Sequence, residues 1–265
     1  MYFCAHFETV IMKKTILLFL AVSLAFSFSS CKKKNACSIS PSDIKQSTVQ
    51  KPATPEEDAS GFCLLTDSIP DVILEIRYFS TYNFVGKRVD GYQEPVALIT
   101  KKAACALHKV SNELKSKGYR LKIYDTYRPQ CAVDHFMRWA KKLDDTLTKA
   151  CFYPNLTKKQ IFDSGFVATK SSHTRGSTVD LTLVDAKTGK EVDMGGVFDY
   201  FEQSSHTDYD GITVAQYNNR MILKDAMIRH GFEPFQGEWW HFTLANEPYP
   251  DTYFTFPVCV ASVKR

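Results

Sequence analysis

Short segments in which apolar and polar residues alternate recur along this chain, separated by longer segments with a helical spacing of apolar residues. The alternating segments span residues 71–80, 119–126, 178–184 and 238–244. A period of two is typical of half-buried β-strands, whereas a period near 3.6 indicates an amphipathic helix. Strands and helices interspersed in this way predict an α+β domain, with a largely antiparallel central sheet flanked by helices.

Local signals predict where three helices begin and end. Thr100 is expected to cap a helix that Gly118 terminates, because a threonine side chain accepts a hydrogen bond from a free backbone N–H and glycine favours the left-handed conformation that ends helices. Pro129 suits the first position of a second helix, where a backbone N–H has no helical partner. A third helix is predicted over residues 214–230, ended by Gly231.

Composition places residues 61–265 in one ordinary globular domain. Apolar residues make up 44% of the chain and charged residues 23%, and a chain of this length can bury a core without metal or disulfide staples. From Gly61 onward, the chain contains 26 Lys and Arg residues and 24 Asp and Glu residues. This small surplus offers no basic stripe for phosphates, so a nucleic-acid partner is not expected.

Residues 1–31 look like an upstream extension followed by a signal peptide. Lys13 and Lys14 precede an apolar run over residues 15–28. As a helix this run would span only about 21 Å, which is too short for a hydrocarbon core of about 30 Å. We therefore expect an exported protein whose translation starts at Met12.

Two processing outcomes are open at the end of the signal segment. Residues 28–31 (FSSC) resemble a bacterial lipobox, in which Cys31 becomes the lipidated N-terminus of a lipoprotein attached to a membrane of the periplasm or cell envelope. The alternative is cleavage near Ser27 or Ser29, which gives a free secreted protein. The lipoprotein is the preferred prediction. Residues 32–60 are polar, with almost no large apolar side chains, and are expected to form a flexible tether.

Cysteine usage gives no clear framework. Six cysteines remain after the signal segment, and their spacings are irregular: Cys37, Cys63, Cys105, Cys131, Cys151 and Cys259. An even number permits disulfides in an exported protein, but the absence of a Cys-x-x-Cys pair argues against a thiolate zinc site. For Cys105 and Cys131, both on predicted helices, we expect buried free thiols.

Two segments carry residues of the types that bind metals and move protons. They are residues 171–180 (SSHTRGSTVD) and 237–242 (GEWWHF). His173, Asp180 and His241 together offer two nitrogens and one oxygen, a ligand set that suits zinc and leaves one coordination position open for catalysis. Glu238, three residues before His241, would then lie near the metal without binding it, where a general base is needed.

Each of these residues is commonplace when taken singly. A lone histidine is more often a hydrogen-bonded core or surface residue than a ligand, and Glu-x-x-His occurs by chance. The adjacent Ser172 and His173 could suggest a serine nucleophile, but no Gly-x-Ser-x-Gly sequence surrounds them. The combination of the two segments, and not any single residue, favours a metal site.

The combination SxHxxGxxxD followed by ExWH resembles the D-alanyl-D-alanine dipeptidase family, zinc enzymes of the VanX type. The likeness extends from about Ile73 to Thr243. Five blocks occur in the family's order and at similar spacing: NFVGKRVDGY (83–92), YDTYRPQ (124–130), SSHTRGSTVDLTL (171–183), DMGGVFDYF (193–201) and GEWWHF (237–242).

The resemblance implies one zinc ion per chain and a set of catalytic roles. His173, Asp180 and His241 would be the zinc ligands, Glu238 the general base, and Arg128 the residue that stabilises the developing oxyanion. For Arg128, a salt bridge or a helix cap beside Pro129 is the structural alternative.

The resemblance also implies four residues near a bound dipeptide: Ser171, Asp199, Tyr78 and Tyr92. Asp199 is the candidate for the substrate ammonium, because a carboxylate offers the opposite charge. Structural alternatives stay open for all of them. Asp199 could cap the segment that follows it, Ser171 could cap the turn around Gly176, and the two tyrosines could serve only in packing.

The expected function is zinc-dependent hydrolysis of the D-Ala-D-Ala dipeptide to two D-alanines, through attack of zinc-bound water with a glutamate general base. The expected partner is this small D-amino-acid dipeptide, in a small pocket that excludes longer peptides. Membrane contact would come only from the N-terminal lipid. Two alternatives remain: a D,D- or L,D-carboxypeptidase acting on peptidoglycan stem peptides, and a non-catalytic zinc-binding module.

Overall fold

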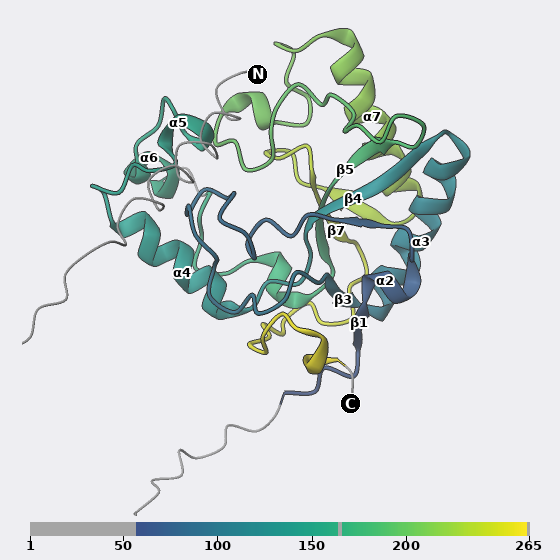
Figure 1. Ribbon diagram of the computed structural model, residues 1–265, viewed down its shortest axis with the longest axis horizontal. Coiled ribbons are helices and arrows are strands. Elements are labelled where there is room, and N and C mark those ends of the chain that lie inside the picture. Colours follow the sequence, from purple (N-terminus) through teal and green to yellow (C-terminus); the bar gives the residue numbers. More distant parts are fainter. Residues whose placement is uncertain (1–56, 164–165, 264–265) are drawn as a thin grey trace, which may run out of the picture. The chain divides into compact units, whose positions relative to one another are not determined.

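The computed structural model describes residues 57–163 and 166–263, which form helices and strands around a mixed sheet (Figure 1). The elements in chain order are β1 (Phe62–Leu64), α2 (Leu65–Ser68), β2 (Ile73–Leu74), β3 (Leu98–Thr100), α3 (Lys101–Ser116), β4 (Tyr119–Asp125), α4 (Gln130–Lys141), α5 (Lys149–Phe152), α6 (Lys158–Asp163), η1 (Ser172–Arg175), β5 (Thr178–Asp185), η2 (Gln203–Ser205), α7 (Val214–Arg229), β6 (Phe232–Pro234), β7 (His241–Leu244) and η3 (Val260–Ser262). The signal segment, Cys31, Cys37 and residues 32–56 of the expected tether lie outside the described residues.

The central sheet has five strands in the order β2-β4-β5-β7-β6. Only the β2–β4 pair is parallel; the β4–β5, β5–β7 and β6–β7 pairs are antiparallel. A separate antiparallel pair joins β1 to β3. The predicted α+β class with a largely antiparallel sheet is therefore confirmed.

Two long helices, α3 and α7, pack against this sheet and against each other. Each of the two helices begins at a threonine that caps its N-terminus. The Thr100 side chain accepts from the backbone N–H of Ala103, and Thr213 forms a reciprocal capping box with Gln216. Both end before a glycine in the left-handed region, at Gly118 and Gly231, as the sequence predicts.

Helix α4 lies away from α3 and α7 in Figure 1 and carries the site's apolar wall. Its buried face includes Phe136 and Trp139, which pack against Phe84 at ring-centroid distances of 4.8 and 4.9 Å. Pro129 occupies the N-cap position, with φ −67° and ψ 154°, one residue before the position that the sequence predicts. Phe84 and Phe136 of this cluster line the pocket described below.

Two of the predicted strands are shorter than expected. In the segment 71–80 only Ile73 and Leu74 form β2, although the backbone of Arg77 still donates to Tyr124 on β4. The chain then turns, because the Asn83 amide donates to three backbone carbonyls in this region. In the segment 238–244 the strand begins only at His241, after a tight turn.

The expectation for Cys105 and Cys131 is wrong in one respect. Both are free thiols on helices, but both are exposed. Each lies on the outer side of its amphipathic helix, next to a buried alanine that faces the core. A helix prediction alone therefore does not say which face a small residue occupies. None of the helices in the described ranges is both long and apolar enough to cross a lipid bilayer.

Candidate active site

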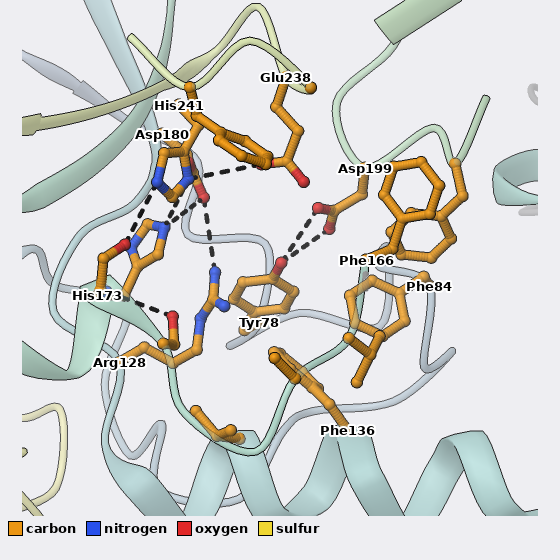
Figure 2. A pocket seen from close by; sticks show the side chains of 18 of the residues that line it. Tyr78, Phe84, Arg128, Phe136, Phe166, His173, Asp180, Asp199, Glu238 and His241 are labelled. Atoms are coloured by element: carbon orange, nitrogen blue, oxygen red, sulfur yellow. Dashed lines mark hydrogen bonds and ion pairs between the residues drawn. The ribbon is translucent and has the colours of Figure 1, made fainter. Parts of the chain in front are cut away.

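A cavity of about 790 Å³ collects nearly all of the candidate residues (Figure 2). At one end it is lined by His173, Asp180, His241 and Glu238, and at the other by aromatic side chains such as Phe166. The prediction of a small pocket is therefore wrong. The volume is within the range of about 300–1,000 Å³ that holds drug-sized ligands.

Three neighbouring strands place polar side chains in one row. Asp125 on β4 pairs with Asp180 on β5, and Asp180 pairs with His241 on β7. Residues directly opposite each other in an antiparallel pair project to the same face of the sheet. The register of the sheet therefore brings together three residues that are 55 and 61 positions apart in sequence.

The short helix η1 brings His173 to the end of this row. The Ser171 side chain accepts from the backbone N–H of His173 at the start of η1. Gly176 ends η1 with φ 82°, and a Cβ at this position would lie 2.1 Å from the Phe62 ring. Glycine is thus required both by the backbone conformation and by the close approach of Phe62.

The spacing of the three candidate ligands fits a tetrahedral ion. His173 Nε2 lies 3.3 Å from His241 Nδ1 and 3.2 Å from Asp180 Oδ2, and His241 Nδ1 lies 3.1 Å from Asp180 Oδ1. Ligand atoms about 2.0–2.1 Å from a tetrahedral zinc ion stand about 3.3 Å apart. Asp180 Oδ1 is buried and has no hydrogen bond to any described residue. The residues present therefore fit a metal ion.

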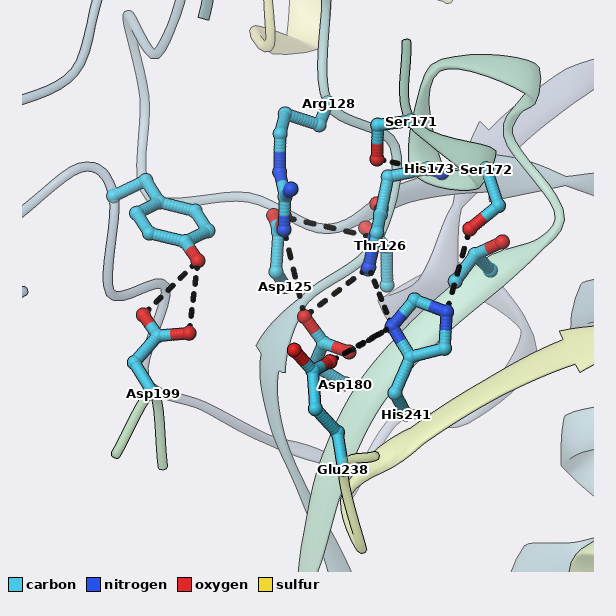
Figure 3. A network of polar contacts seen from close by, with 12 residues as sticks. Asp125, Thr126, Arg128, Ser171, Ser172, His173, Asp180, Asp199, Glu238 and His241 are labelled. Atoms are coloured by element: carbon cyan, nitrogen blue, oxygen red, sulfur yellow. Dashed lines mark hydrogen bonds and ion pairs between the residues drawn. The ribbon is translucent and has the colours of Figure 1, made fainter. Parts of the chain in front are cut away.

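Backbone and side-chain oxygens fix both imidazole rings. His173 Nδ1 lies 2.7 Å from the carbonyl oxygen of Thr126. A carbonyl oxygen can only accept, so the proton sits on Nδ1 and the Nε2 lone pair faces Asp180 and His241. His241 Nε2 lies 3.3 Å from Ser172 Oγ, which leaves its Nδ1 directed at the same point (Figure 3).

The protonation states favour ligand binding. Burial lowers the pKa of His173 from 6.5 to about 4, so this imidazole is neutral at pH 7. Burial by itself would raise the pKa of Asp180, but the imidazoles of His173 and His241 outweigh it and lower that pKa below 3.8. A neutral imidazole and an ionised carboxylate are the forms that bind a divalent cation.

Glu238 stands beside this group without joining it. Its Oε2 lies 3.5 Å from His241 Nδ1, and its carboxyl group points into the cavity (Figure 2). Burial raises the pKa of Glu238 from 4.5 to about 7. A carboxyl group with a pKa near neutrality is suited both to take up and to give back a proton.

Arg128 enters the cavity from the loop after β4. Its Nε donates to Asp125 Oδ2 at 2.9 Å, and its Nη2 lies 3.6 Å from Asp180 Oδ2 (Figure 3). The guanidinium also lies 4.8 Å from the Tyr78 ring centroid. The contact with Asp125 fits the salt bridge that the sequence leaves open as a structural alternative, and Arg128 also lines the cavity.

Tyr78 and Asp199 form a second polar contact inside the cavity. The Tyr78 hydroxyl lies 3.0 and 3.2 Å from the two carboxylate oxygens of Asp199. Asp199 has φ 61°, and among the described residues it is the only non-glycine residue with positive φ. Strain of this kind clusters at functional sites. Burial raises the pKa of Asp199 well above its usual value, and the Arg128 guanidinium offsets this only in part.

Of the other residues implied near a dipeptide, one lines the cavity and one does not. Ser171 lines it, although its hydroxyl also caps η1. Tyr92 is buried outside the cavity lining, and its hydroxyl donates to Asp125 Oδ1 at 2.7 Å. The structure therefore places Tyr92 behind Arg128, with Asp125 between them.

Sequence reasoning missed Asp125, which links Tyr92, Arg128 and the His173 region. Asp125 Oδ2 lies 3.6 Å from His173 Nδ1, and burial raises the pKa of Asp125 to about 7. Its position three residues before Arg128 in YDTYRPQ was the available signal. Thr126 and Ser172, which orient the imidazoles, carry no sequence signal because their roles depend on tertiary contacts.

A scan against protein families matches residues 58–259 to the peptidase family M15 model, described as D-ala-D-ala dipeptidase. The chain belongs to the D-Ala-D-Ala dipeptidase family. The family resemblance inferred from the sequence is thereby confirmed, and membership makes this protein a peptidase.

Members of this family from several bacteria are similar over most of the chain. The D-alanyl-D-alanine dipeptidase of Enterococcus faecalis is 43% identical over 199 residues, covering 75% of this chain and 98% of that protein. The enzyme of the same name from Enterococcus faecium is 41% identical over 75% of this chain and 98% of that protein. The enzyme of the same name from Streptomyces coelicolor is 41% identical, covering 74% of this chain and 98% of that protein.

Solved structures of VanY proteins are more distant from this member of the dipeptidase family. A vancomycin-resistance D,D-pentapeptidase VanY variant, solved in complex with Zn(II), aligns with a TM-score of 0.36 at 16% identity, covering 60% of this chain and 78% of that one. VanYB in complex with D-alanine-D-alanine has the same TM-score and identity, over 58% of this chain and 76% of that one.

Proposed function

We propose that this protein hydrolyses the dipeptide D-Ala-D-Ala to two D-alanines with the help of one zinc ion. The observation that carries the proposal is the convergence of His173, Asp180 and His241 on one point, with Glu238 beside it in the same cavity. The enterococcal and Streptomyces relatives named D-alanyl-D-alanine dipeptidase support the choice of substrate.

The residues that would hold zinc are His173 through Nε2, His241 through Nδ1 and Asp180 through its carboxylate. Three protein ligands are typical of catalytic zinc sites, whereas structural sites are closed by four. When bound there, zinc supplies Lewis acidity toward the peptide carbonyl and lowers the pKa of water.

Glu238 acts as the proton carrier of the reaction. Its carboxylate accepts a proton from the attacking water, and the resulting carboxylic acid gives this proton to the amine of the leaving D-alanine. Burial in the cavity keeps its pKa near neutrality, so both transfers are accessible to the same group. Glu238 therefore moves a proton without being consumed.

Arg128 stabilises the negative charge that develops on the carbonyl oxygen of the scissile peptide. Its guanidinium is held by Asp125 at one nitrogen, so it need not reorganise when charge appears. Tyr78 and Phe136 flank it at 4.8 and 5.1 Å and exclude water from its faces. A fixed cation in such surroundings interacts more strongly with an oxyanion than one in bulk water.

Asp199 recognises the free ammonium of the dipeptide. A substrate cation next to this buried carboxylate would restore the ionised form that burial disfavours. Tyr78 holds the carboxylate in position through its hydroxyl. A requirement for a free amino group would explain preference for a dipeptide over a longer peptide that ends in the same residues.

The test is a substrate panel with the zinc-loaded protein. We expect release of D-alanine from D-Ala-D-Ala, little hydrolysis of L-Ala-L-Ala, and none from a stem pentapeptide. Release of D-alanine from the pentapeptide but not from the dipeptide would favour a carboxypeptidase, which the cavity's volume of about 790 Å³ could accommodate. Zinc binding without cleavage of any peptide in the panel would favour a non-catalytic module.

A further inference from the structure

A second cavity, of about 290 Å³, lies outside the site described above. It is lined by Arg77, Tyr124, Phe198 and Trp239, with Glu75 and Glu191 among its polar residues. None of these side chains has a role in the proposed hydrolysis. Its volume is ample for a ligand the size of a single amino acid.

The guanidinium of Arg77 is the unusual feature of this cavity. The side chain is only 7% exposed; its Nε is paired with Glu75, whereas its Nη1 has no hydrogen-bond partner among the residues that the structure describes. Its Cζ lies 4.4 and 4.7 Å from the ring centroids of Tyr82 and Tyr124. A buried cation between aromatic faces, with unused donors, is suited to an anionic oxygen ligand.

Trp239 adds a second unused donor. Its side chain is buried, and its indole Nε1 has no hydrogen-bond partner among the described residues. Gly196, which lines the same cavity, carries no side chain that could cover the indole, since a Cβ there would lie 3.8 Å from Nε1. Buried polar groups of this kind are normally satisfied, so two in one cavity indicate a missing partner.

Acidic groups supply the opposite charge. Glu75 Oε1 lies 2.6 Å from Arg77 Nε, and Glu191 accepts from the Tyr124 hydroxyl at 3.0 Å. Both carboxylates are partly exposed and share Lys122 as an ion-pair partner. The cavity therefore has unused donors inside and carboxylates toward solvent, an arrangement complementary to a zwitterion.

The two cavities are lined by residues that are neighbours in the chain. Three pairs of chain neighbours place one residue in each cavity: Arg77 and Tyr78, Phe198 and Asp199, and Trp239 and Glu238. A ligand that orders Arg77 and Trp239 would therefore act directly on the backbone that positions Tyr78 and Glu238.

We propose that the second cavity is a binding site for a small amino acid, whose carboxylate is held by Arg77 and Trp239 and whose ammonium faces Glu75 and Glu191. The proposal does not depend on which peptide the enzyme cleaves.

Direct binding of D-alanine, L-alanine, acetate and methylammonium to the zinc-loaded full chain tests this site. We expect alanine to bind more tightly than acetate, and methylammonium not to bind in an Arg77-dependent way. Arg77→Lys keeps the charge but removes the planar fork of donors, and Trp239→Phe removes only the indole N–H. Each should weaken alanine binding about tenfold or more, as is typical for hydrogen bonds to charged groups.

Two control variants separate the second cavity from other effects. Trp139→Phe removes another buried indole N–H without a partner, but Trp139 lines neither cavity, so alanine binding should be unchanged. Asp199→Asn alters the catalytic cavity, so it removes alanine held there through its ammonium and should leave the Arg77-dependent part of alanine binding unchanged. Alanine affinity that is equal in wild type, Arg77→Lys and Trp239→Phe, or absence of binding by any probe, would overturn the proposal. Alanine binding in a protein that cleaves no dipeptide would overturn the proposed function and leave this site intact.

Discussion

At the scale of single residues, the site separates Glu238 from the three candidate metal ligands, as the proposed mechanism requires. Glu238 lies within 3.5 Å of His241, yet the three shortest ligand-to-ligand distances do not involve it. The structure thus predicts that metal binding and proton transfer can be separated by mutation.

Glu238→Gln should keep its zinc and lose turnover. The amide has nearly the same shape but cannot carry the proton, and loss of a general base typically costs about 10²–10⁴ in rate. Metal analysis and kcat on the purified variant check this. A folded Glu238→Gln protein without zinc would make Glu238 a ligand and not the base.

Asp125→Asn should reduce kcat by about 10- to 100-fold, the usual effect of removing a group that orients an active-site residue. The amide cannot hold the charge of Arg128 as a carboxylate does, although Tyr92 could still reach its oxygen. Steady-state kinetics measures the change. The matched variant Tyr92→Phe removes only the hydroxyl on the other oxygen and should cost less, and an equal loss in both would contradict a role through Arg128.

At the scale of secondary-structure elements, caps and turns hold the site's geometry. Helix η1 is only four residues long, so its position depends on the Ser171 cap and on the left-handed conformation of Gly176. Helices α3 and α7 are joined at their C-terminal ends by Glu113, which contacts Arg229, His230 and Lys117. The Ser171 cap and Gly176 position the candidate ligand His173, whereas the contacts of Glu113 only stabilise the fold.

Gly176→Ala should destabilise the protein by about 1–3 kcal/mol or more, because it adds both backbone strain and a clash with Phe62. Zinc affinity should fall as well, since η1 carries His173. Thermal unfolding and zinc titration test the two effects. Gly118→Ala is the matched control: its φ is also positive, at 85°, but a Cβ there would contact nothing within 4 Å. Equal zinc affinity in both variants would contradict the positioning role.

Glu113 gives a pH-dependent contribution to stability. Hydrogen bonds from Arg229, Lys117 and His230 lower its pKa from 4.5 to about 2. A lowered folded-state pKa means that the stabilisation is present above pH 4.5 and is lost as the pH falls toward 2. Glu113→Gln should therefore unfold more easily than wild type at pH 7, by about 1 kcal/mol or less, and the difference should vanish near pH 2. Denaturant titrations at both pH values provide the measurement, and a difference that is the same at both would exclude this origin.

At the scale of the whole molecule, the sequence predicts what depends on neighbours in the chain. The boundaries of α3 follow from Thr100 and Gly118, which act on adjacent backbone groups. The sequence places Asp125 near Arg128, but its place beside Asp180 was not predictable, because it depends on the pairing of β4 with β5. The shortness of β2 depends on Asn83, which lies nine residues beyond the end of that strand. The volume of the pocket depends on aromatic residues that come from several elements.

The location of the protein in the cell is a property of the whole chain, and only the sequence bears on it. We propose that Cys31 is lipidated and that the protein is attached to the cell envelope, since residues 12–31 have the charge and length of a lipoprotein signal. Cys31→Ala should move the protein from the membrane fraction to the soluble fraction of cells. Cys37→Ala, six residues further on, is the matched control and should leave the distribution unchanged. A Cys31→Ala protein that still sediments with membranes would contradict the lipobox.

The row of Asp125, Asp180 and His241 has a consequence for assembly of the sheet. Side chains in a strand alternate between faces, so sliding β5 by a single residue would turn Asp180 into the opposite layer and bring its apolar neighbours to the cation position. A chain with that error could not hold the proposed ion, so ion uptake would report correct alignment of the strands. Refolding followed by metal capture would count only those molecules in which the three strands have met in the native order.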